Sequence, residues 1–169
     1  PVEEPRVRYA DLSTSERNRM RCEREFLSVC AQHPEVALEQ AAAMAQVKWH
    51  SALYASVAGV LLQVLEENPN ATPAQMVTQA TAAVPQAARI LTSAQSLRDM
   101  PEADEATPAR LARFLAEELA IGDQEEAIEQ LQGQLNNPSI SPDEADLYFN
   151  MVVSMQAELT SMRQAHKLL

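Results

Sequence analysis

A repeated helix-start signal constrains the fold of this chain more than any other feature. Three times, a serine or threonine is followed three residues later by an acid or an amide, a pattern that caps the N-terminus of a helix. These pairs are Ser13 with Glu16, Thr72 with Gln75, and Ser141 with Glu144. Thr107 before Pro108 marks a fourth start, because proline suits the first helical position. With only three glycines in 169 residues and few aromatic residues to favour sheets, we predict an all-α fold.

The starts, and the breaks between them, predict two subdomains. We expect an irregular leader over residues 1–12, a helical bundle subdomain over 13–100, and a long helix with a C-terminal antiparallel helical hairpin over 101–169. The expected bundle helices cover about 13–32, 34–46, 51–66, 72–83 and 85–98. Residues 99–107 lack apolar periodicity, so we expect them to connect the two parts.

Apolar residues at heptad spacing indicate that the two final helices pack on each other. In the first helix these are Phe114, Ile121, Ile128 and Leu135, with Leu111 and Leu131 beside them. In the second they are Tyr148, Val152, Met155, Leu159, Met162, His166 and Leu169. A short link at 136–143 makes the helices antiparallel neighbours. Two helices alone bury little apolar surface beyond the seam between them, so we expect the pair to pack against the bundle or against a partner.

The negative charge is concentrated in one region. Thirteen acids lie between Asp99 and Asp146, against two bases, Arg110 and Arg113, and this difference equals the net charge of −11. Such a surface repels phosphates, so we expect no direct binding of nucleic acid. Two interpretations stay open for the acids: a solvated surface, or an interaction surface.

The sequence also bears on location. The chain contains no apolar run of about 18 residues and no apolar core after its charged N-terminus, so we expect no membrane span, no signal peptide and a cytoplasmic location. Cys22 and Cys30 would lie roughly 12 Å apart on one helix, too far for a disulfide, and free thiols fit a reducing compartment. Because the chain begins with Pro1, we expect it to be a piece of a longer polypeptide.

Catalytic and metal-binding patterns are sparse. Cys30 and His33, three residues apart, could supply a nucleophile with its base or two metal ligands. Zinc needs three or four ligands, and Cys22, His50 and His166 are distant. We interpret Cys30 as part of a buried stripe and His33 as the end of a helix. There is no phosphate loop or serine nucleophile elbow, so we expect no catalytic residue, metal or other cofactor in this chain.

Several motifs occur in a fixed order. They are EFL (25–27), QHPE (32–35), WH (49–50), YASV (54–57), QEEAIEQLQGQLNN (124–137), SISPDEADL (139–147) and YFNMVVSMQAELTSMRQ (148–164). In this order they resemble the C-terminal helicase-binding domain of bacterial primase, DnaG, over about residues 13–169. In that family a bundle related to the N-terminal domain of the replicative helicase, DnaB, precedes a helical hairpin.

The resemblance implies a non-catalytic domain that binds the N-terminal domains of the hexameric helicase, recruiting and modulating primase during primer synthesis in DNA replication. The polymerase and zinc-binding domains would precede Pro1. Contact residues follow by location only, in the C-terminal hairpin: Asp143, Leu147, Met151, Met155, Glu158, Met162, Leu168 and Leu169. Two alternatives stay open, namely the helicase N-terminal domain itself and a small helical redox protein that uses Cys30 and His33.

Overall fold

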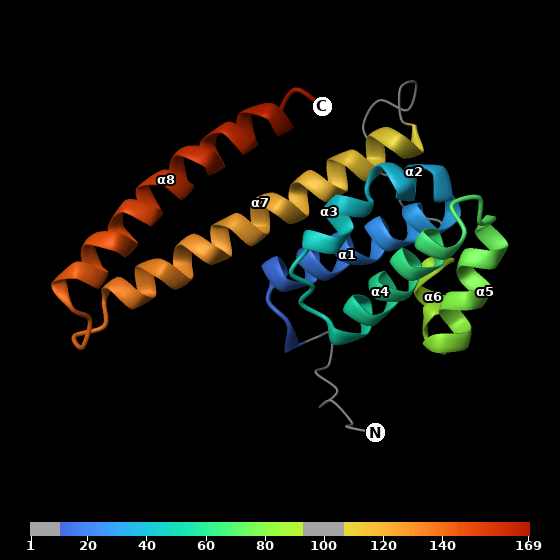
Figure 1. The fold of residues 1–169 in the computed structure, drawn as a ribbon, viewed down its shortest axis with the longest axis horizontal. Helices are drawn as coiled ribbons and strands as arrows, with labels where there is room; N and C mark the ends of the chain where they lie inside the picture. Colours follow the sequence, from blue (N-terminus) through green and yellow to red (C-terminus); the bar gives the residue numbers. More distant parts are fainter. Residues whose placement is uncertain (1–10, 93–106) are drawn as a thin grey trace.

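The computed structural model describes residues 11–92 and 107–169, and within these ranges it contains α-helices and no strand (Figure 1). The helices are α1 (Thr14–Gln32), α2 (Pro34–Glu39), α3 (Ala41–Gln46), α4 (Ala52–Glu67), α5 (Pro73–Ala83), α6 (Ala87–Leu91), α7 (Pro108–Leu135) and α8 (Pro142–His166). The all-α prediction is confirmed. None of the described helices is both long and apolar enough to cross a bilayer.

The helix-start signals lie where the sequence placed them. At α1, the Ser13 N–H donates to Glu16 Oε2 (2.7 Å) and the Glu16 N–H donates to Ser13 Oγ (3.2 Å). The same reciprocal caps open α5 and α8, and the Thr107 hydroxyl accepts from the Arg110 N–H at the start of α7. Each cap satisfies backbone donors that the first turn of a helix leaves without partners.

Two predicted bundle helices differ from those observed. The helix expected over 34–46 is two helices, because Gln40 takes φ −98° and ψ 6°, outside the helical range, and changes the chain direction. The helix expected over 85–98 begins only at Ala87, after a turn in which the Ala87 N–H donates to the Val84 carbonyl (2.9 Å). The expected leader, apart from residues 11 and 12, and the stretch 93–106 lie outside the described residues.

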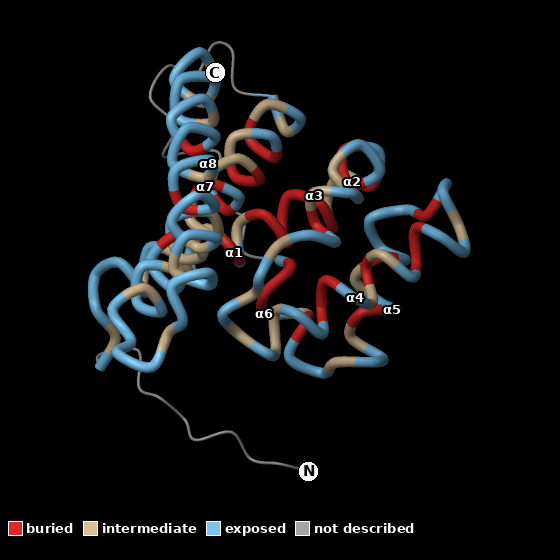
Figure 2. The backbone as a smooth tube through the Cα atoms, turned by 60° about the vertical axis from the view of Figure 1, so that its left-hand side comes forward, coloured by how far each residue is buried: buried red, intermediate tan, exposed pale blue. Residues whose placement is uncertain are grey.

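The main core forms around α1, which packs against α4, α5, α6 and α7. Phe26, Leu27 and Cys30 of α1 are fully buried, as the stripe interpretation predicts. The first half of α7 completes this core, since Leu115 is 5% and Leu119 0% exposed. Figure 2 shows the buried residues on the inward sides of these helices.

A second, smaller cluster lies between α7 and α8. Its buried members are Ile121, Ile128, Val152 and Leu159, and Leu131, Leu135, Met155 and Met162 pack against them. The two helices run side by side in opposite directions, and the end that carries the link projects away from the bundle (Figure 1). The subdomain division predicted near residue 100 lies outside the described residues. The two apolar clusters divide within α7, between Leu119 and Ile121.

Candidate functional site

Residues 147–155 of α8 are almost all apolar, and only Asn150 and Ser154 interrupt them. Successive residues of a helix point about 100° apart, so such a run places apolar side chains on every side of the helix. α8 packs against α7, which covers one of these sides. Part of the apolar run is therefore left in contact with solvent.

The uncovered apolar face consists of Leu147, Phe149, Met151 and Val153, whose exposed fractions are 57%, 60%, 42% and 50%. Only two other large apolar residues of the described chain are as exposed, Leu38 and Leu168. Met151 and Val153 precede and follow the buried Val152, so they lie on opposite sides of the seam with α7. The face thus has two edges, Leu147–Met151 and Phe149–Val153.

The two edges differ in shape. A shallow hollow of about 320 Å³ lies on the Leu147–Met151 edge. Asn150, Ser154 and Met155 complete its lining. Its size and apolar lining fit a side chain from another protein.

The part of the chain that carries the uncovered apolar face is rich in acids. Between Arg113 and Arg163 the sequence contains no lysine or arginine and ten acids. These are Glu117, Glu118, Asp123, Glu125, Glu126, Glu129, Asp143, Glu144, Asp146 and Glu158. Arg163 is itself paired with Glu125 at 2.6 Å. Glu117 and Glu118 contact His166 near the bundle, and Asp123 is paired with Arg19 of α1. Glu129, Asp143, Glu144 and Asp146 lie toward the projecting end of the α7–α8 pair, which is therefore apolar and negatively charged.

The contact residues predicted from the resemblance fall into three groups. Exposed on α8 are Asp143, Leu147, Met151 and Glu158, and half-buried against the seam are Met155 and Met162. Leu168 (87% exposed) and Leu169 lie at the other end of α8, where they line a hollow with residues of the bundle, so they belong to a different surface. Phe149 and Val153 were missed, although the unbroken apolar run at 147–149 and 151–153 was a readable signal.

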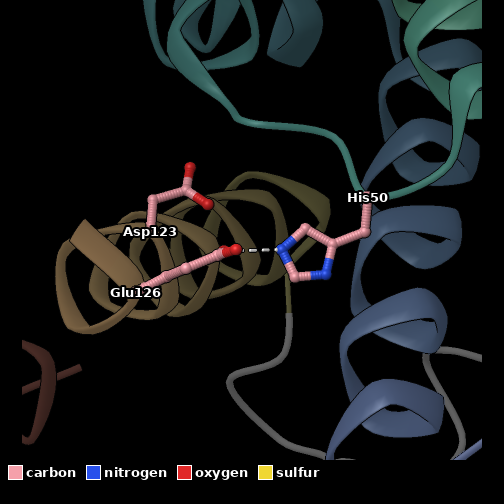
Figure 3. Close-up of side chains that lie close together, drawn as sticks. All are labelled: His50, Asp123 and Glu126. Atoms are coloured by element: carbon pink, nitrogen blue, oxygen red, sulfur yellow. Dashed lines mark hydrogen bonds and ion pairs between the residues drawn. The ribbon is translucent and has the colours of Figure 1, made fainter. Parts of the chain in front are cut away.

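A second cluster brings together His50, Asp123 and Glu126 (Figure 3). His50 Nε2 lies 2.9 Å from Glu126 Oε2, and the three potential ligand atoms lie within 4.8 Å of one another. By residue type these groups could hold a divalent cation. However, both oxygens of Asp123 already accept hydrogen bonds, from Arg19 Nη2 (2.7 Å) and from the Lys48 N–H (2.9 Å). The positive charge of Arg19 opposes a cation there, so we interpret the cluster as structural.

The cluster belongs to a polar junction formed by Arg19, Glu23, His50, Asp123 and Glu126. The carboxylate of Glu23 is fully buried and accepts from the His50 N–H at 2.7 Å. Burial raises the pKa of Glu23, and the hydrogen bond from His50 and the charge of Arg19 oppose that rise only in part. The junction ties α1 and the segment before α4 to the middle of α7.

The thiol interpretation has little support from the geometry. Cys30 is fully buried, and burial raises its pKa to about 12. Its thiol therefore stays protonated near neutral pH, whereas the thiolate is the nucleophile and the metal ligand. His33 ends α1 and its N–H donates to the Val29 carbonyl at 3.0 Å.

The strongest candidate site is thus the uncovered apolar face with its neighbouring acids. It combines exposed apolar area, a hollow and unbalanced charge on a helix that projects from the bundle. Comparisons of the chain with protein-family models, with curated proteins and with solved structures found no match.

Proposed function

We propose that this chain is a non-catalytic docking domain that binds the replicative DNA helicase and recruits a primase to it. The observation that carries the docking role is the uncovered apolar face, in which four large side chains within seven residues are 42–60% exposed. Large apolar side chains exposed close together on one helix are typical of protein–protein contacts. The choice of partner rests on the resemblance of residues 13–169 to the helicase-binding domain of primases.

The size of the uncovered apolar face suits reversible recruitment. Full burial of an apolar side chain contributes about 1.5–3 kcal/mol, and about half of each of these four surfaces remains to be buried. Together they contribute on the order of 4 kcal/mol, against about 4–15 kcal/mol for the loss of translational and rotational freedom. Binding therefore needs further contacts and is expected to be reversible.

The test is a binding titration of the whole chain against the cognate helicase hexamer. We expect the wild-type chain to bind, and a variant with Leu147→Ser, Phe149→Ser, Met151→Ser and Val153→Ser to bind at least about 100-fold more weakly, since up to about 4 kcal/mol is lost and 1.4 kcal/mol corresponds to tenfold in affinity. Because these side chains are exposed, the variant should keep its helix content, which circular dichroism verifies.

The matched control is Leu38→Ser, which removes an apolar side chain of similar exposure (42%) from the bundle. We expect this variant to bind as the wild type does. Absence of binding by the wild-type chain would refute the proposed partner. Binding by the variant with four substitutions that is as strong as wild-type binding would refute the assignment of the docking surface.

A further inference from the structure

The Leu147–Met151 edge carries charge in a pattern that the other edge lacks. Asp143, Leu147, Met151 and Glu158 follow steps of four, four and seven residues, so they form one stripe along α8. All four are exposed. The stripe therefore begins and ends with an acid and has two apolar side chains between them.

Neither acid of this stripe is neutralised within the described chain. Glu158 lies 3.3 Å from the neutral amide of Gln124, and no lysine or arginine of the described residues pairs with Glu158 or Asp143. The Phe149–Val153 edge has an acid, Asp146, one turn before Phe149. In the other direction α8 carries Arg163, roughly 15 Å beyond Val153, and Arg163 pairs with Glu125. The Leu147–Met151 edge thus combines a hollow with an acid toward each end that no lysine or arginine of the described residues neutralises.

This charge pattern decides what kind of surface can cover the edge. A second copy of this chain would bring the same acids against Asp143 and Glu158, and like charges disfavour such a contact. Nucleic acid is disfavoured for the same reason. A partner surface that is apolar and carries lysine or arginine complements both the apolar side chains and the negative charge of the edge.

We propose that the Leu147–Met151 edge receives an amphipathic helix of the partner, which places an apolar side chain in the hollow and basic side chains opposite Asp143 and Glu158. At 1.5 Å per residue the two acids lie roughly 22 Å apart along α8, so the partner helix that contacts both acids spans about four turns. The apolar pair lies nearer to Asp143 than to Glu158, so a partner helix whose basic and apolar residues have the same unequal spacing fits in one direction only. This inference rests on the proposed function, because it names the chemistry of the partner's surface.

The experiment compares the two edges with the cognate helicase hexamer as the probe. Leu147→Ser with Met151→Ser removes one edge, and Phe149→Ser with Val153→Ser removes the other, with closely matched initial exposure. We expect the first pair of changes to weaken binding at least tenfold and the second to weaken it less than threefold. Equal losses, or a larger loss on the Phe149–Val153 edge, would overturn the assignment of the edge.

The charge is tested at 50 mM and 300 mM salt. Asp143→Asn with Glu158→Gln should weaken binding about fivefold at 50 mM and reduce the difference between the two salt concentrations, because opposite charges steer association and are screened by salt. The control, Asp146→Asn with Glu129→Gln, removes two exposed acids outside the stripe and should leave affinity within twofold. Binding that is independent of salt and of Asp143 and Glu158 would overturn the basic partner surface while leaving the proposed function intact. If the wild-type chain does not bind the helicase, both the proposed function and this inference are wrong.

Discussion

Arg19 and Glu23 lie one turn apart on α1 and bring two charges into the polar junction with α7. Arg19 Nη1 donates to the Leu119 carbonyl (3.1 Å), and a Cβ added at Gly122 would lie only 2.8 Å from this nitrogen. A side chain at position 122 would therefore displace the guanidinium group of Arg19 from its present position. Glu23 Oε2 has no hydrogen-bond partner and lies 3.9 Å from Arg19 Nε. Burying such a carboxylate costs free energy that its ion pair offsets only in part.

Glu23→Gln tests this cost through its pH dependence. The pKa of Glu23 is raised above its ordinary value of 4.5 in the folded chain, so the native state binds a proton more tightly than the unfolded state does. The wild-type free energy of unfolding therefore contains a contribution that is fully present below about pH 4.5 and is lost as pH rises through the folded pKa. Its size is about 1.4 kcal/mol per unit of pKa difference.

Urea unfolding of both proteins from pH 4 to pH 8 measures this contribution. We expect the wild-type stability, relative to Glu23→Gln, to fall across that range, because glutamine has no titrating proton. A difference between the two proteins that stays constant with pH would show that Glu23 does not titrate in this window.

At the scale of the element, α8 is held to α7 at its C-terminal end as well as along the seam. His166 Nδ1 lies 3.1 Å from Glu117 Oε2, and its Nε2 lies 2.5 Å from Glu118 Oε1. The His166 ring also stacks on Phe114, with 4.5 Å between ring centroids, and Arg110 donates to the Leu169 carbonyl. These contacts fasten one end of α8 close to the bundle, while its other end projects with the uncovered apolar face.

His166→Ala should loosen that fastened end. Loss of the ring contact and of the hydrogen bonds to Glu117 and Glu118 is expected to cost about 1–2 kcal/mol of stability. Amide hydrogen exchange should become faster in the last turns of α8 and stay unchanged around Val152, roughly 21 Å away along the helix. Gln164→Ala, at an exposed position in the same turn, is the control and should leave exchange unchanged. Unchanged exchange in His166→Ala would mean that the seam alone holds this end.

The predicted and missed elements differ in how local their causes are. The starts of α1, α5 and α8 could be predicted because each capping pair spans three residues of sequence. The break at Gln40 could not, because neither glycine nor proline marks it. The contact between His50 and Glu126 joins residues 76 positions apart and depends wholly on the tertiary fold.

Two of the four side chains in the uncovered apolar face, Leu147 and Met151, were named from the sequence, by their location in the C-terminal hairpin. Phe149 and Val153 were missed. The heptad pattern shows which residues of α8 face α7, but it does not show that among the described residues no other helix covers the remaining sides of α8. The extent of the uncovered apolar face required the packing of α8 to be known.

At the scale of the whole molecule, α7 belongs to two cores. Its first half, with Leu111, Leu115 and Leu119, completes the core around α1, and its second half packs against α8. The polar junction binds the middle of α7 to α1 and to the segment before α4. One continuous helix therefore joins the bundle to the part of α8 that carries the uncovered apolar face, so the bundle and the docking surface are expected to fold as one unit.

Removing everything after Met100 should accordingly unfold the bundle. The truncation exposes the surface that Leu111, Leu115 and Leu119 cover, and burial of three leucines contributes about 4–9 kcal/mol, comparable to the whole stability of a domain at about 5–15 kcal/mol. We expect residues 1–100 to lack a cooperative thermal transition. A chain that ends at Asn137 keeps α7 and should melt cooperatively, although it exposes Ile121 and Ile128. If residues 1–100 melted as sharply as the whole chain, α7 would be an addition to the bundle rather than part of its core.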